Sequence, residues 1–436
     1  MQHPIGIGLA GLGNVGAGVF KHLQNNRALL RERLGLDIEV RRIAVRNPSQ
    51  RASEGYPAAL LTDNWQDLIT DPAVQIVVEV MGRKEESLNL ILEALNSKKA
   101  VVTANKALLA EFGAEIFEAA TRNNTPVFYE ASVGGGIPVI KCLREALIGN
   151  HIDSIHGIIN GTSNYILTRM TEAELSFQEA LAEAQAAGYA EPDPSFDVNG
   201  WDAAHKAMIL ASLAYGFWIP KDKIFVEGIE HLTAADIRFA KSLGYKIKLL
   251  GIIKASGEDK DAEIEVRVHP TLIPQDHVLA SVNGVFNAIA VHGSVVGEML
   301  LYGRGAGQNP TSSAVLSDIA EAADALTRPR RDLGFIPHSL YGSCKAIDSI
   351  KSEYYLRLTV EDRPGVIAQI AGILGELHIG ISSILQPESD EEGSNVALVM
   401  MIHTATNTQI NEAIKRIDAL PCVNRPPRMI RVEHFS

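Results

Sequence analysis

Two lysines and a carboxylate stand where they could transfer a proton. Asp202 and Lys206 are four residues apart in a stretch with a helical pattern, so their side chains share one face of the helix. The surrounding residues are mostly apolar or small, which favours partial burial. A buried lysine beside a carboxylate is either a structural ion pair or part of a functional site. Lys106 comes just after a predicted strand, where it is either an exposed loop lysine or a ligand-binding group.

A second set of residues is typical of dinucleotide binding. The segment Gly11-Leu12-Gly13-Asn14-Val15-Gly16 follows a predicted strand and opens a predicted helix, which is the context that this motif requires. Its first glycine can make a tight turn, its second lets the backbone approach a pyrophosphate, and its third lets the helix pack closely. The N–H groups at the helix start would face the anion. A glycine-rich turn without a ligand is the alternative.

The residues after the second predicted strand bear on which dinucleotide binds. NAD sites usually carry an acid here for the ribose 2′-hydroxyl, but this strand ends at Val45 and is followed by Arg-Asn-Pro-Ser-Gln-Arg. We therefore predict a preference for NADP, with NAD also possible. Arg46, with Arg51 as a further candidate, would pair with the 2′-phosphate. Both arginines could instead be solvated loop charges.

These groups fit a reductase. Such an enzyme holds a carbonyl near the nicotinamide, stabilises the charge that develops on its oxygen and supplies a proton, and lysines can do the last two. An amino-acid substrate also needs a partner for its ammonium group, for which Glu191 and Asp197 are candidates. A calcium loop starting at Asp193 is rejected, because Val198 and Ala204 stand where an EF-hand needs glycine and glutamate.

The order of the predicted elements indicates three structural parts. In the N-terminal third, strands at 5–9, 38–45, 76–80, 100–103 and 126–129 alternate with helical patterns such as 15–30, 86–95 and 108–121, which is typical of a Rossmann-type parallel sheet. From residue 134, helices such as 138–147 and 177–187 mix with β-like runs such as 262–268 and 288–291, which favours an α+β domain. Residues 354–432 follow the ferredoxin-like order βαββαβ.

The predicted domain boundaries follow from these patterns. Residues 1–133 form the nucleotide-binding domain, completed by part of 303–327, and residues 134–327 form the substrate-binding, catalytic and dimerisation domain. Residues 328–352, with two prolines and two glycines, are expected to be a linker to a regulatory domain at 353–436.

Composition excludes several classes of protein. The 436 residues are too many for one ordinary core, and 46% hydrophobic with 21% charged residues is typical of soluble proteins. The net charge of -12 argues against a nucleic-acid partner. No apolar run is long enough to span a membrane. The apolar run at 5–12 lacks a basic leader and has too many glycines for a signal peptide, so we expect a cytoplasmic protein. The three cysteines, Cys142, Cys344 and Cys422, have no disulfide or zinc spacing.

Together the motifs resemble those of homoserine dehydrogenases from Gly11 to about Ala325, and the C-terminal part resembles an ACT domain. Beyond the glycine-rich turn, the matching segments are 103–106, 130–138, 157–165, 191–194, 197–200 with Asp202 and Lys206, 303–307 and 310–311. The resemblance implies reversible reduction of L-aspartate 4-semialdehyde to L-homoserine with NAD(P)H. It assigns Lys206 as proton donor, Asp202 beside it, Lys106 near cofactor and substrate, and Glu191 as a substrate binder. The remaining predicted contacts are Asp197 and Thr162 for the substrate, and Thr103, Lys106, Gly161 and Gly305 for the cofactor.

The resemblance also implies an ion and an effector. Glu130 with the carbonyls of Val133, Gly135 and Ile137 matches the family's site for Na+ or a similar structural cation, a ligand set that suits a weakly held hard cation. A turn without an ion is the alternative. The segment 361–366, Glu-Asp-Arg-Pro-Gly-Val, is similar to ACT domains, whose usual ligand in this family is L-threonine, the feedback inhibitor. A module that only dimerises is the alternative; a homodimer or homotetramer is expected.

Two other functions are weighed against this one. An inactive Rossmann–ACT amino-acid sensor is disfavoured by the intact Lys106, Glu191, Asp202 and Lys206. Another amino-acid semialdehyde reductase on the same scaffold is possible, since a fold does not determine its substrate. A dehydrogenase that forms acyl phosphates would need a nucleophilic cysteine, and none of the three cysteines lies in a suitable motif.

Overall fold

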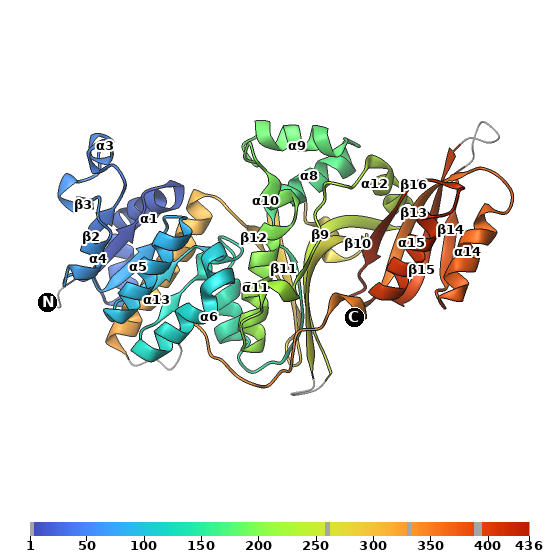
Figure 1. Cartoon of the computed structure of the whole chain (residues 1–436). Coiled ribbons are helices and arrows are strands. Elements are labelled where there is room, and N and C mark those ends of the chain that lie inside the picture. The colour runs from blue at the N-terminus through green and yellow to red at the C-terminus, as the bar shows by residue number, and fades with distance from the viewer. Residues whose placement is uncertain (1–3, 258–261, 329–332, 388–394, 436) are drawn as a thin grey trace.

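The computed structural model describes residues 4–257, 262–328, 333–387 and 395–435. In Figure 1 the chain runs from a blue and cyan nucleotide-binding part, through a green and yellow central part, to a red C-terminal part. The predicted fold class is confirmed for all three. Residues 329–332 of the predicted linker lie outside the described residues.

The N-terminal part is a parallel sheet in the order β3-β2-β1-β4-β5-β6. The order reverses between β1 and β4, which are neighbours although they are not consecutive, and ligands bind at such a switch point. The strands are β1 (Ile5–Ala10), β2 (Ile38–Ala44), β3 (Leu61–Thr62), β4 (Ile76–Glu79), β5 (Ala100–Thr103) and β6 (Val127–Phe128). The helices are α1 (Asn14–Asn25), α2 (Arg27–Leu34), α3 (Pro48–Ser53), α4 (Gln66–Thr70), α5 (Lys84–Asn96) and α6 (Lys106–Asn123).

Two details of this part differ from the prediction. The single helix expected over 15–30 is wrong: α1 ends at Asn25, and α2 starts again after Asn26, whose backbone leaves the helical region. Strand β3 was not predicted, because its two residues are too few to show an alternating pattern.

A helix from far along the chain covers this sheet. In α13 (Gln308–Thr327), Val315 and Ile319 are buried in the same core as Ile7 and Val78 of the strands. Gln308 Nε2 donates to the carbonyl oxygen of Asn14 at 2.9 Å. The nucleotide-binding core therefore includes residues from α13.

The central part is a mixed sheet with helices on one side. Its strands are β7 (Ile152–Ile158), β8 (Phe225–Val226), β9 (Tyr245–Ser256), β10 (Glu263–Pro274), β11 (Phe286–Gly293) and β12 (Gly297–Arg304). Its helices are α7 (Val139–Lys141), α8 (Gly161–Glu172), α9 (Phe177–Ala186), α10 (Ser195–Val198), α11 (Trp201–Tyr215) and α12 (Ala234–Ser242). The helix predicted over 138–147 is only partly α-helical, since a π-helical turn, Cys142–Ala146, follows α7.

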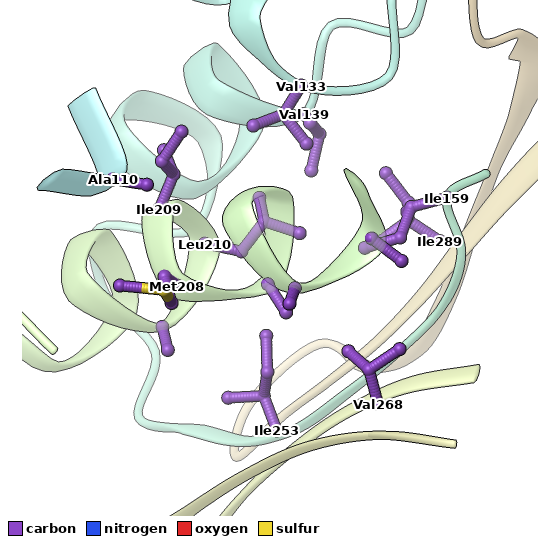
Figure 2. Packing of buried hydrophobic residues seen from close by; sticks show 14 of the residues in the cluster. Ala110, Val133, Val139, Ile159, Met208, Ile209, Leu210, Ile253, Val268 and Ile289 are labelled. Atoms are coloured by element: carbon purple, nitrogen blue, oxygen red, sulfur yellow. The ribbon is translucent and has the colours of Figure 1, made fainter. Parts of the chain in front are cut away.

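Helix α11 is enclosed on nearly all sides. Figure 2 shows Ile253 and Val268 of the sheet below the helix, and Val133 and Val139, from the segment that follows the nucleotide-binding sheet, above it. Because the helix lies between the two parts, every residue from Asp202 to Ser212 is buried. Its polar residues near the N-terminus therefore need partners inside the protein.

The C-terminal part has the ferredoxin-like strand order β16-β13-β15-β14, as predicted. Its elements are β13 (Lys351–Glu361), α14 (Val366–Glu376), β14 (Ile381–Leu385), β15 (Asn395–Thr406), α15 (Asn407–Asp418) and β16 (Val423–Val432). Strand β16 also pairs in parallel with β10, where Thr271 lies opposite Arg431 and Leu272 opposite Val432. The C-terminal and central sheets are thus continuous, which the sequence did not indicate.

The predicted linker lies along the earlier parts. Tyr129 Oη donates to the carbonyl oxygen of Gly334 at 2.8 Å, and Ile264 N donates to the carbonyl oxygen of Ser343 at 2.8 Å. Within the described residues, no helix is long and apolar enough to cross a membrane.

Candidate active site

The predicted lysines meet at one carboxylate. Lys206 Nζ lies 2.7 Å from Asp202 Oδ2, and Lys106 Nζ lies 3.2 Å from Asp202 Oδ1. Lys206 and Asp202 come from α11, while Lys106 is the first residue of α6 at the carboxyl end of β5. The two parts of the protein therefore each contribute a lysine to the cluster.

Charge partners determine the ionisation of this carboxylate. Burial raises the pKa of Asp202, but the ammonium groups of Lys206 and Lys106 outweigh that effect and hold the pKa below its usual range. Asp202 is therefore ionised at neutral pH. Lys206, itself buried, also donates to the carbonyl oxygen of Ile159 at 2.7 Å.

Asn160, which was not predicted as a site residue, also belongs to the cluster. Its Nδ2 donates to Asp197 Oδ1 at 2.7 Å and to Asp202 Oδ2 at 2.8 Å. Its Oδ1 accepts from Ser163 N at 2.7 Å, which caps α8. The preference for asparagine before a helix was a signal for the cap, but the links to the carboxylates depend on the tertiary fold.

The predicted substrate residues lie at different depths. Asp197 is half-buried, and its pKa is raised by burial and by the charge of Asp202. Thr162 Oγ1 donates to the carbonyl oxygen of Tyr189 at 2.8 Å, near the loop that carries Glu191. The side chain of Glu191 is exposed, and no described contact joins it to Asp202 or Lys206.

The glycine-rich turn has the geometry that the motif requires. Gly11 has φ of +104°, a conformation that favours glycine. A β-carbon on Gly16 would lie 2.1 Å from Gly11 O, so only glycine lets α1 start this close to β1. Gly13 has open space where a β-carbon would stand, as the approach of a pyrophosphate requires.

A cavity of about 730 Å³ extends from this turn and is lined by Gly11, Gly13, Arg46 and Arg51, among others. Arg51 is paired with Glu54 at 2.6 Å, whereas no ion pair joins Arg46 to another described residue. Asp63, which follows β3, also lines the cavity and was not predicted. The lining thus carries both arginines and carboxylates, and its volume and its position at the glycine-rich turn suit a dinucleotide.

The other predicted cofactor residues are not among those that line this cavity. Thr103 is fully buried, and its hydroxyl donates to Glu79 Oε2 at 2.7 Å, so its side chain holds two strand ends together and does not face the cleft. Gly161 opens α8 beside the cluster, and Gly305 lies in the loop before α13. The backbone oxygen atoms of Asn14 and Val15 accept from side chains of α13.

The predicted cation loop is compact. Both carboxylate oxygens of the buried Glu130 accept backbone N–H groups, from Ile140 at 2.9 Å and Lys141 at 2.8 Å, and burial raises its pKa. Gly135 packs so closely that a β-carbon there would lie 2.5 Å from Gly305 O. The loop that carries Val133 and Ile137 thus lies against the loop before α13.

The sequence of this chain matches family models and known enzymes over nearly its whole length. Family models match residues 11–130 (homoserine dehydrogenase, NAD binding domain), 138–320 (homoserine dehydrogenase) and 354–422 (ACT domain). A homoserine dehydrogenase from Pseudomonas aeruginosa is 44% identical over 438 residues, covering 99% of this chain and 100% of the relative. One from Helicobacter pylori is 44% identical over 435 residues, covering 100% of both chains.

Solved structures agree with these matches. A homoserine dehydrogenase from Thiobacillus denitrificans superimposes with a TM-score of 0.91 at 42% identity, covering 99% of this chain and 98% of that one. A hyperthermophilic archaeal homoserine dehydrogenase in complex with NADPH gives a TM-score of 0.62 at 27% identity, covering 75% of this chain and 99% of that one. The chain therefore belongs to the homoserine dehydrogenase family of oxidoreductases acting on CH–OH groups, in a form with a C-terminal ACT domain.

Proposed function

We propose that the chain interconverts L-homoserine and L-aspartate 4-semialdehyde with NADP, and less effectively with NAD, at the cluster around Asp202. The observation that carries the proposal is one ionised carboxylate bonded to two lysines, Lys206 at 2.7 Å and Lys106 at 3.2 Å, one from each part of the protein. The cofactor, when bound, exchanges a hydride with the substrate carbon.

Lys206 is the proton donor in the direction of reduction. Its ammonium group has three N–H bonds, of which two point to Asp202 Oδ2 and Ile159 O, both at 2.7 Å. The third remains for the substrate carbonyl oxygen. Asp202 orients the ammonium group, and in the direction of oxidation Lys206 takes the proton back from the hydroxyl.

Lys106 stabilises the charge that develops on the same oxygen. Its side chain is 33% exposed and its Nζ lies 3.2 Å from Asp202 Oδ1, so a substrate can reach the ammonium group. Two ammonium groups around one carboxylate leave net positive charge at the reacting end, which favours the negatively charged transition state. Asp197, Glu191 and Thr162 are the proposed contacts of the amino-acid end of the substrate.

Two further ligands complete the proposal. Arg46 at the rim of the cavity supports binding of the 2′-phosphate of NADP, because it has no carboxylate partner among the described residues. A structural monovalent cation near Glu130 is supported by the buried carboxylate and the turn at Val133, Gly135 and Ile137, whose carbonyls suit a hard ion. The ACT domain supports regulation by L-threonine, and we propose a homodimer or homotetramer.

The direct test uses the purified chain, L-homoserine and NADP. A rate of NADP reduction that requires L-homoserine, and that L-serine and L-threonine do not replace, is the expected result. A folded protein that shows no rate with either NADP or NAD would favour the inactive sensor. A rate that appears only with another amino alcohol would favour a different semialdehyde reductase.

A further inference from the structure

Asn287, on β11, carries a buried amide with no partner in the described structure. The residue is 1% exposed, and both Nδ2 and Oδ1 lack a hydrogen bond to any described group. A buried amide left unpaired costs free energy, so most such groups in proteins are bonded. A ligand that reaches this amide would satisfy it.

The amide lies between two loops of the proposed cofactor site. A β-carbon on Gly305 would stand 2.0 Å from Asn287 Oδ1, and one on Gly161 would stand 3.6 Å from the same oxygen. Gly161 directly follows Asn160, whose side chain bonds Asp202. Asn287 Oδ1 is therefore close to both glycines and beside the catalytic cluster.

The start of α8 offers hydrogen-bond donors near the acceptor oxygen of Asn287. The cap Asn160 accepts only from Ser163 N, and the backbone N–H groups of Gly161 and Thr162 have no acceptor among the described residues. The place thus offers N–H donors from the helix start and an oxygen acceptor from Asn287. A primary carboxamide matches both, because its oxygen accepts and its NH2 donates, whereas a carboxylate can only accept.

We propose that Asn287 binds the carboxamide of the nicotinamide ring, with Oδ1 accepting from the carboxamide NH2 and the first N–H groups of α8 available to its oxygen. The carboxamide is attached next to the ring carbon that carries the hydride. A hydrogen bond from Asn287 to the carboxamide would therefore orient the ring so that the carbon that carries the hydride faces the substrate beside Lys206. This inference rests on the proposed function, since it requires a nicotinamide cofactor.

The test compares NADP with its 3-acetylpyridine analogue, which keeps the oxygen but lacks the NH2 group. Isothermal titration calorimetry gives Kd for both ligands with the wild type and with Asn287→Leu, which keeps the shape of the side chain without its polar atoms. Asn287→Asp retains an acceptor oxygen. Asn283→Ala is the matched control, because Asn283 bonds Lys248 and Glu172 away from the two glycines.

The wild type and Asn283→Ala should bind NADP about three- to tenfold more tightly than the analogue, the effect of one hydrogen bond. Asn287→Leu should lose this preference through weaker NADP binding, and Asn287→Asp should keep it. If Asn287→Leu does not fold, Asn287→Ser is measured instead. The shorter serine side chain places its oxygen too far from the carboxamide to bond it, so this variant should also lose the preference for NADP.

An unchanged preference in the folded leucine or serine variant would overturn the inference, as would a wild type without any preference. A raised KM for L-homoserine with an unchanged preference would assign the amide to the substrate instead. Failure of the wild type to bind either ligand would contradict the proposed function itself, so the two failures are distinguishable.

Discussion

At Asp202, burial and ion pairing act on the pKa in opposite directions, and ion pairing prevails because two lysines approach within 3.2 Å. Removing one partner of a buried ion pair leaves the other charge uncompensated, so the stability of Asp202, Lys206 and Lys106 in their charged forms depends on the presence of their partners. Asn160 adds a neutral donor that bonds both Asp202 and Asp197. The cluster is therefore a connected unit, and substitutions within it should not have additive effects.

A prediction at the residue scale concerns Arg46. Arg46→Ala should lower kcat/KM for NADP relative to NAD by about 10- to 100-fold, because one charge-assisted hydrogen bond to the 2′-phosphate is lost. Steady-state rates with both cofactors measure the ratio. The control is Arg41→Ala, since Arg41 is paired with Glu39 and does not line the cavity. If the NADP/NAD ratio is unchanged in Arg46→Ala, Arg46 does not bind the phosphate.

A second residue-scale prediction concerns His205, which lies next to Lys206 in α11. Burial, with the charge of Lys221, lowers its pKa to about 4, and neither ring nitrogen has a partner among the described residues. The unfolded chain takes up this proton near pH ~6.5 and the folded chain only near its lowered pKa. The free energy of unfolding should therefore fall as the pH falls through that window.

Urea denaturation at pH 7 and pH 4.5 measures this effect. The wild type should lose roughly 2–3 kcal/mol from His205 over this interval. His205→Gln, which cannot titrate, should lose that much less. Equal losses in both proteins would show that His205 is not the group responsible.

At the scale of elements, two glycines in the turn between β1 and α1 should have different roles, Gly16 in stability and Gly13 in cofactor binding. Gly16→Ala should destabilise the protein by about 1–3 kcal/mol, because its β-carbon would meet Gly11 O at 2.1 Å. Gly13→Ala should leave the free energy of unfolding nearly unchanged, because the space there is open, yet weaken NADP binding. Denaturation and calorimetric titration measure the two effects. Equal stability losses in both variants would contradict this division.

The elements also show what the sequence could predict. The glycine motif, the helix spacing of Asp202 and Lys206, and the position of Lys106 after a strand are local features, so each could be located from the sequence. The bonds from Asn160 to two carboxylates join segments that only the fold brings together. The exposure of Glu191 and the burial of Thr103 likewise depend on the neighbouring chain. Local patterns therefore predicted most of the longer elements and the position of each candidate residue along the chain, but not the contacts between segments that are distant in sequence.

Over the whole molecule, the C-terminal and central parts share one sheet. Strand β16 extends β10 in parallel, and just beyond it the buried Glu433 is bonded to Arg267 at 2.9 Å and to Lys254. Strand β10 also carries Val268, which packs beneath α11 (Figure 2). A continuous set of contacts thus joins the C-terminal domain to the helix that carries Lys206.

This connection leads to a prediction at the scale of the molecule. L-threonine should slow the oxidation of L-homoserine by binding the ACT domain, and the inhibition should not be competitive with L-homoserine, because the two sites are separate. Initial rates over a matrix of both concentrations distinguish the two patterns. No effect at concentrations well above cellular ones would indicate that this domain only dimerises.

The central claim is that Lys206 transfers the proton, and its most direct test is the rate of homoserine-dependent NADP reduction by Lys206→Ala. The variant should turn over at least about 100-fold more slowly than the wild type, the usual contribution of a general acid or base, while the Kd for NADP stays within a few fold. Lys248→Ala, which removes a buried lysine bonded to Asn164 and Val282, controls for loss of a buried ammonium group. Near-normal turnover by folded Lys206→Ala would contradict the mechanism and remove Lys206 from it.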